Sequence, residues 1–189
     1  MYDVSDLRKG LKVEIDGDPW TITEFDFTKP GKGQAIYRCK LKNLLTGVTM
    51  DKSYRSSDKG IEKADLEERE MYYSYVEGDF LVFSDAETYE ELRVSKKVLG
   101  NSIYFLMEEA LCKILLFKSK PVEVTLPIFI EKVIVATEPG ARGDTATNVS
   151  KPAKLDNGYE IAVPIFVNEG DKVRIDTRTG QYVERVTKA

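Results

Sequence analysis

The chain has 189 residues, of which 42% are hydrophobic and 32% charged, a composition typical of folded domains with a charged surface. The net charge of −4 excludes binding of a polyanion through overall charge, and the absence of histidine excludes Ser-His-Asp and Cys-His catalysis and imidazole metal sites. No apolar run approaches the roughly 20 residues of a membrane-spanning helix, so we expect a cytoplasmic protein with no membrane contact.

The sequence of residues 1–64 predicts short strands with turns between them. Apolar and polar side chains alternate over residues 11–27 on both sides of the turn Asp-Gly-Asp-Pro at 16–19, which predicts a β-hairpin. The pattern returns over residues 36–50, across a turn at Thr46 and Gly47. We therefore predict a small β-barrel over residues 1–64.

Residues 65–128 and 129–189 continue in the same way. From Met71 the stretch "MYYSYVEGDFLVFSD" predicts a second hairpin, residues 98–109 are the best helix candidate, and two strands follow around 118–121. These elements fit a five-stranded Greek-key barrel. In the last third, turn residues recur at about ten-residue spacing, which favours another barrel or sandwich. The fold class predicted is all-β, with short helices and three consecutive small barrels.

One segment stands out by charge. Residues 28–42 contain five cationic side chains and no acidic one, although residues 65–128 carry 13 acidic and only 7 basic side chains. The cations are Lys29, Lys32, Arg38, Lys40 and Lys42. This segment, unlike the whole molecule, suits contact with a polyanion.

The sequence "KPGKG" lies at the centre of this segment and predicts a hairpin tip. Pro30 fixes its φ angle, Gly31 and Gly33 accept positive φ, and Lys32 between them is expected to point outward. A flexible ammonium on a rigid arm suits an anionic backbone or covalent extension by another enzyme. The alternative is that the glycines only form the turn and Lys32 is an ordinary solvated residue. The spacing does not match a phosphate-binding P-loop.

Several stretches together resemble bacterial elongation factor P, in the same order and along nearly the whole chain. They are "KPGKGQA", "YRSSDK", "ADLEERE", "DAETYEEL", "TEPGARGDTATNVSKPAKLDNGYEIAVPIFV" and "GDKVRIDTRTGQYVERV". The resemblance implies an SH3-like (KOW-like) domain over 1–64, then OB-fold domains over 65–128 and 129–189, in an L-shaped outline like that of transfer RNA.

The resemblance also implies a function. Such factors bind both ribosomal subunits between the peptidyl (P) and exit (E) sites. There they stimulate peptide-bond formation when the nascent chain stalls, notably at consecutive prolines. We accordingly expect a translation elongation factor that is a monomer in solution, has no enzymatic activity and needs no cofactor or metal.

By the same resemblance, Lys32 approaches the acceptor end of the P-site peptidyl-tRNA and is the target of a lysine-modifying enzyme, with Pro30, Gly31, Gly33 and Gln34 completing the tip. The loop "GDTATN" would lie near messenger RNA in the exit site. The expected RNA-binding residues are Lys29, Arg38, Lys40, Lys42, Gly143, Asp144, Thr145, Ala146, Thr147, Asn148, Tyr182 and Arg185. For each the alternative is an ordinary role: a solvated strand face, a connecting loop or half-buried packing.

Two other classes of function compete with this one. SH3-like and OB barrels also occur in general single-stranded RNA-binding and ribosome-assembly proteins, which would bind RNA without depending on Lys32. An enzyme that uses carboxylates such as Asp144 or Asp176 is the third class, but no paired-acid or metal-ligand spacing supports it.

Overall fold

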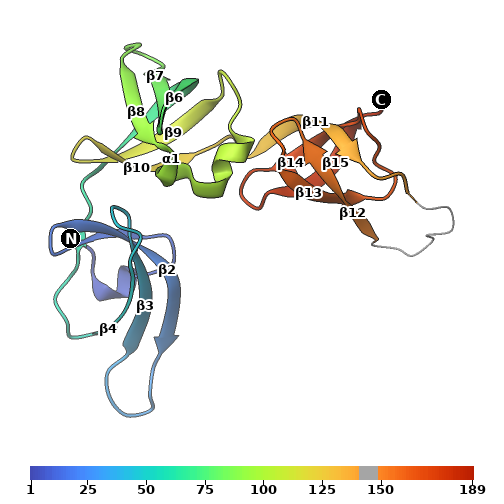
Figure 1. The fold of residues 1–189 in the computed structure, drawn as a ribbon. Coiled ribbons are helices and arrows are strands. Elements are labelled where there is room, and N and C mark those ends of the chain that lie inside the picture. Colours follow the sequence, from blue (N-terminus) through green and yellow to red (C-terminus); the bar gives the residue numbers. More distant parts are fainter. Residues whose placement is uncertain (141–148) are drawn as a thin grey trace. The chain divides into compact units, whose positions relative to one another are not determined.

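The computed structural model describes residues 1–140 and 149–189. By their contacts these residues form two compact units, Met1–Arg69 with Ile114–Glu123 and Glu70–Lys113 with Val124–Ala189. The described residues contain three five-stranded antiparallel sheets, one short α-helix and two 3-10 helices (Figure 1). The predicted all-β fold with short helices is confirmed. Within the described ranges, no helix has the length and apolar character needed to cross a membrane.

The first sheet has the strand order β4-β3-β2-β1-β5. Its core contains Val13, Ile22 and Leu41, each buried because alternate strand residues point to the same side of the sheet. A short 3-10 helix, η1 (Val4–Asp6), contributes Val4 to the same core. The strands are β1 (Lys12–Ile15), β2 (Asp18–Thr28), β3 (Ile36–Asn43), β4 (Thr49–Arg55) and β5 (Glu62–Lys63).

The second and third sheets share one topology. Counted along the chain within each sheet, the strand order is third, second, first, fourth, fifth. The second sheet consists of β6 (Leu66–Glu77), β7 (Phe80–Asp85), β8 (Glu91–Ser95), β9 (Leu111–Phe117) and β10 (Lys120–Thr125). The third consists of β11 (Phe129–Thr137), β12 (Ser150–Leu155), β13 (Glu160–Pro164), β14 (Lys172–Asp176) and β15 (Gln181–Thr187).

The helix expected over residues 98–109 is wrong in length and position. The structure has α1 at Lys96–Leu99, followed by the 3-10 helix η2 at Gly100–Phe105 and an irregular stretch up to β9. Gly100 has a φ of 55° at the end of α1, a conformation that glycine adopts without strain and that ends an α-helix. The apolar residues whose spacing predicted one helix therefore lie partly in a single α-helical turn and partly in a 3-10 helix.

The domain boundaries predicted at 64/65 and 128/129 stay a prediction. Each predicted range contains one sheet, since the strands of the three sheets end at Lys63, Thr125 and Thr187. The division by contacts, however, gives two units rather than three.

Both cysteines are free and buried. Burial raises the pKa of the Cys39 thiol, and raises that of Cys112 to about 11. Both thiols therefore stay protonated at neutral pH and pack as small apolar side chains.

Asp171, immediately before β14 of the third sheet, is a fully buried carboxylate. It accepts hydrogen bonds from the backbone N–H of Ala189 at 2.7 Å and of Asn168 at 2.9 Å, and from Arg185 Nη1 at 3.3 Å. The Ala189 and Asn168 N–H groups, followed by Arg185, lower the pKa of the carboxyl below its ordinary value. The charged form of Asp171 therefore stabilises this end of the sheet.

Replacing Asp171 by asparagine is expected to lower the free energy of unfolding by about 2 kcal/mol at pH 7, the order of a hydrogen bond to a charged group. Because the folded-state pKa is depressed, the contribution of Asp171 is complete above its ordinary pKa of 3.8 and is lost as the pH falls below it. Urea unfolding followed by circular dichroism from pH 3 to 7 measures this. A difference between wild type and variant that stays constant across this range would contradict the assignment.

Candidate nucleic-acid interface

The sequence-predicted hairpin forms an arm built from three strands of the first sheet. β2 and β3 pair up to Thr28 and Ile36, and β4 pairs with β3 up to Arg55, opposite Ile36. The loop that joins β2 to β3 extends beyond the end of the sheet (Figure 1). The last fully paired row, Thr28–Ile36–Arg55, is therefore the base from which the tip projects.

All five residues of the tip, 29–33, are exposed. Gly33 has a φ of 113°, which only glycine adopts readily, so the turn depends on this residue. Among the residues that the structure describes, no hydrogen bond or ion pair involves the side chain of Lys32, and the same holds for Lys29 and Lys42. Lys32 thus projects from the tip as a solvated cation, in the orientation that the glycines predicted.

The base of the tip is fastened by the segment after β4. Ser57 Oγ donates a hydrogen bond to Gln34 Oε1 at 2.8 Å, and the Ser56 N–H donates to the Ala35 carbonyl at 3.2 Å. Asp58 makes a local contact within this segment, since its carboxylate accepts a hydrogen bond from the Arg55 N–H at 2.7 Å. Sequence reasoning assigned Gln34 to the tip but missed Ser57, whose only signal was its place in the motif "YRSSDK".

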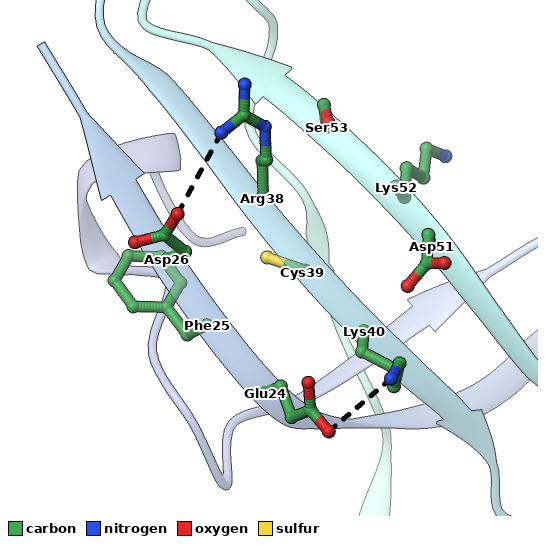
Figure 2. A pocket seen from close by; sticks show the side chains of 9 residues that line it. All are labelled: Glu24, Phe25, Asp26, Arg38, Cys39, Lys40, Asp51, Lys52 and Ser53. Carbon is green, nitrogen blue, oxygen red and sulfur yellow. Dashed lines mark hydrogen bonds and ion pairs between the residues drawn. The ribbon is translucent and has the colours of Figure 1, made fainter.

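One face of the arm carries alternating charges, and we call it the ion-paired face: Glu24, Asp26, Arg38, Lys40, Asp51 and Ser53. Arg38 lies 3.9 Å from Asp26, and Lys40 lies 3.4 Å from Glu24 (Figure 2). The Arg38 and Asp26 side chains remain 58% and 72% exposed, so each pair contributes only about 0.2 to 1 kcal/mol to stability. Their main effect is to offset two of the five cations of the segment.

A shallow pocket of about 300 Å³ lies along these strands, and its lining includes both ion pairs (Figure 2). Because the lining carries cations and anions together, it offers no net charge to a phosphate. The pocket therefore contributes little to a nucleic-acid interface.

The opposite side of the arm is aromatic, which the sequence analysis did not anticipate. We call it the aromatic face: Phe25, Phe27, Tyr37, Lys52 and Tyr54. The Tyr37 ring centroid lies 5.0 Å from that of Phe27 and 6.3 Å from that of Phe25. Lys52 Nζ lies 5.3 Å from the centre of the Tyr54 ring, within cation–π distance. The signal for this face was present in the residue types, but only the strand register brings the rings together.

Matches to known families cover most of the chain. The descriptions "Elongation factor P (EF-P) KOW-like domain", "Elongation factor P (EF-P) OB domain" and "Elongation factor P, C-terminal" match residues 3–59, 66–124 and 130–185. Elongation factor P of Desulfotalea psychrophila is 50% identical over 186 residues, which are 98% of this chain and 99% of the relative. That of Desulforapulum autotrophicum is 50% identical over 188 residues and covers 100% of both chains.

The chain belongs to the elongation factor P family. It is accordingly a translation elongation factor with a KOW-like and an OB domain, rather than an enzyme. The solved structure of eukaryotic translation initiation factor 5A from Methanococcus jannaschii has a similar fold, with a TM-score of 0.51 and 24% identity over 66% of this chain and 90% of that one.

Two further RNA-binding residues predicted for this elongation factor lie in the third sheet, in the other unit. Arg185 pairs with the buried Asp171, donates to the Phe166 carbonyl at 3.2 Å and lies 5.0 Å from the centre of the Phe166 ring. Tyr182 is half-buried, lines a groove of about 580 Å³ with Phe166, and has a pKa raised by burial. Both side chains have packing roles, and their contact with RNA stays a prediction.

The remaining expected RNA contacts, Gly143, Asp144, Thr145, Ala146, Thr147 and Asn148, lie outside the described residues. Within the described ranges, no group of three or more His, Cys, Asp or Glu side chains is arranged to hold a metal ion. What the structure brings together is thus the tip with Lys29, Arg38, Lys40 and Lys42 on one arm.

The exposure of the tip predicts its reactivity toward an amine-modifying reagent. Lys151 is the natural reference, since it is only 8% exposed and its Nζ donates to the Glu138 carbonyl. Limited acetylation followed by peptide mass spectrometry should show Lys32 modified at least about tenfold faster than Lys151, because a buried amine reacts only after local opening. Equal rates for the two lysines would mean that Lys32 folds back onto the protein.

Proposed function

We propose that this elongation factor binds the ribosome between the P and E sites and relieves stalling at consecutive prolines by positioning peptidyl-tRNA through Lys32. The observation that carries the proposal is the tip itself: in a chain of this family, Lys32 lies exposed at the end of a three-stranded arm, with no partner among the described residues. Membership of the family makes the protein a translation elongation factor, and the arm is the part that we propose contacts the substrate.

The chemistry of the arm favours a role in positioning the substrate over a direct role of Lys32 in making the bond. Lys32 offers an ammonium with three hydrogen-bond donors, and charge-assisted hydrogen bonds to phosphate oxygens are among the stronger polar contacts in proteins. Within the tip itself, residues 29–33 contain no acidic, histidine, serine, threonine or cysteine side chain, and the nearby Ser57 and Asp58 side chains form hydrogen bonds at the base of the tip. Such a contact accelerates a reaction by holding the substrate in a reactive geometry, while the bond-making groups belong to the ribosome.

The stiffness of the arm lowers the entropic cost of positioning a substrate. Three paired strands and the Ser57–Gln34 hydrogen bond fix the base of the tip, so little conformational entropy is lost there on binding. The exposed amine is also open to a lysine-modifying enzyme, and a longer side chain would extend the reach of the cation.

The other partners follow from the same proposal. Residues 143–148 would approach messenger RNA in the exit site, and the factor would act as a cytoplasmic monomer that contacts both ribosomal subunits. A general single-stranded RNA-binding function is less well supported, because Arg38 and Lys40 are offset by Asp26 and Glu24.

Replacing Lys32 by alanine should abolish most of the relief of stalling at consecutive prolines in a reconstituted translation assay. A lost charge-assisted contact predicts a fall in rate of roughly 10- to 150-fold. Lys120→Ala, which removes an exposed lysine from the start of β10, is the matched control and should retain full activity. Unchanged relief by Lys32→Ala would refute the proposal, and strong RNA binding without ribosomes in that variant would favour the general RNA-binding function.

Removing the acids of the ion-paired face should strengthen binding to RNA. The double variant Glu24→Gln with Asp26→Asn leaves Arg38 and Lys40 without partners, so we expect tighter ribosome binding and a slope of log affinity against log salt steeper by about one to two. Glu90→Gln with Glu91→Gln changes the net charge equally at two exposed positions at the start of β8 and is the control. Identical slopes for the two double variants would show that Arg38 and Lys40 contact no phosphate.

A further inference from the structure

The aromatic face of the arm contains a ring that the protein leaves half uncovered. Phe27 is 48% exposed, although it lies in a strand and contacts Tyr37. Phe25, by contrast, packs against the core of the first sheet, and Tyr54 is buried. A single half-exposed ring is common on protein surfaces, and Phe80 of the second sheet is exposed to a similar degree, so the case for Phe27 depends on its position and on the charges around it.

The position of Phe27 relates it to the tip. Its row, Phe27–Tyr37–Tyr54, is the last row on this face, and only Thr28 separates it from Lys29 and the loop. Tyr37 supports the ring from one side, while the rest of the ring faces solvent. An occupant of this surface would therefore lie beside the two lysines of the tip.

The charges around Phe27 indicate the kind of occupant. The cations on the ion-paired face are offset by Glu24 and Asp26, whereas Lys29 and Lys32, two and five residues after Phe27 in the chain, have no partner in the described structure. An open aromatic ring next to unpaired cations is the combination that binds single-stranded nucleic acid, in which bases stack on rings and phosphates meet lysines. An apolar protein segment has no negative charge to pair with the two lysines, whereas RNA does, so charge complementarity favours RNA.

We infer that the aromatic face, with Phe27 as its open ring, stacks an unpaired RNA nucleobase while Lys29 and Lys32 contact the adjacent phosphates. This inference rests on the proposed function and adds a second anchor to it. The base comes either from the 3′ end of transfer RNA or from ribosomal RNA, and both present the same planar surface to the ring. Phe27 then positions the RNA strand that Lys32 holds.

The first experiment compares Phe27→Leu with Phe27→Tyr in the stalling-relief assay. Leucine keeps an apolar contact with Tyr37 but removes the ring, so the factor concentration for half-maximal relief should rise roughly 5- to 150-fold, whereas tyrosine should stay near wild type. Phe80→Leu, which removes a 46% exposed ring from β7 of the second sheet, is the control and should have no effect. Thermal unfolding of each variant verifies its folding. A change of less than twofold for Phe27→Leu would overturn the inference.

The second experiment observes the stack directly and does not depend on activity. Trp20 is the single tryptophan, so Trp20→Phe combined with Phe27→Trp places one fluorophore on the aromatic face. Binding to ribosomes with transfer RNA in the P site should quench its emission, as stacking on a base does. Loss of quenching with transfer RNA that lacks its 3′-terminal nucleotides assigns the base to that molecule, and persistence assigns it to ribosomal RNA. A blue shift without quenching would indicate a protein contact and overturn the inference.

The two proposals fail separately. If Lys32→Ala loses relief while Phe27→Leu does not, the stacking inference is wrong and the proposed function stands. If Lys32→Ala retains full relief, the proposed function is wrong, and the emission of the tryptophan at position 27 on the ribosome alone decides whether the aromatic face binds a base.

Discussion

The register of β2, β3 and β4 determines every property of the arm. Because side chains alternate between the faces of a strand, a slip of one residue would exchange the two faces and move Arg38 away from Asp26 and Tyr37 away from Phe27. The observed register gathers charges on one face and rings on the other. It also ends all three strands in the same row, which leaves the tip as the only part of the hairpin outside the sheet.

Sequence patterns predicted the arm but not its two faces. The apolar residues Trp20, Ile22, Phe25 and Phe27 step by two, then three, then two, and the structure has a bulge between Ile22 and Glu24 that absorbs the extra residue. The tip was equally readable, because proline and glycine restrict the local backbone whatever surrounds them. The ion pairs and the ring contacts depend on which residues lie opposite each other on neighbouring strands, and one strand read alone does not contain that information.

Features that depend on contacts between residues far apart in the sequence were still harder to predict. The order third-second-first-fourth-fifth in two sheets requires the fourth strand to pair with the first, across two intervening strands, and turn signals identify only neighbouring partners. The helix at 98–109 failed for a related reason. Its apolar spacing is real, but Gly100 in a positive-φ conformation ends α1 within one turn. Arg185 was predicted to contact RNA, and its pairing with Asp171, which lies immediately before β14, could not be predicted from the sequence of its own strand.

The distribution of charge explains how an acidic protein can approach RNA selectively. A net charge of −4 repels nucleic acid at a distance, and the acids opposite Arg38 and Lys40 offset the cations that would attract it along the arm. Uncompensated charge remains at the tip, where screening within about a Debye length limits its action to phosphates in near contact. Under the proposed function, such a tip would bind poorly to exposed RNA in general but well to a strand that a larger assembly presents at a fixed place. Selectivity then arises from geometry, since the assembly must bring the strand to the arm.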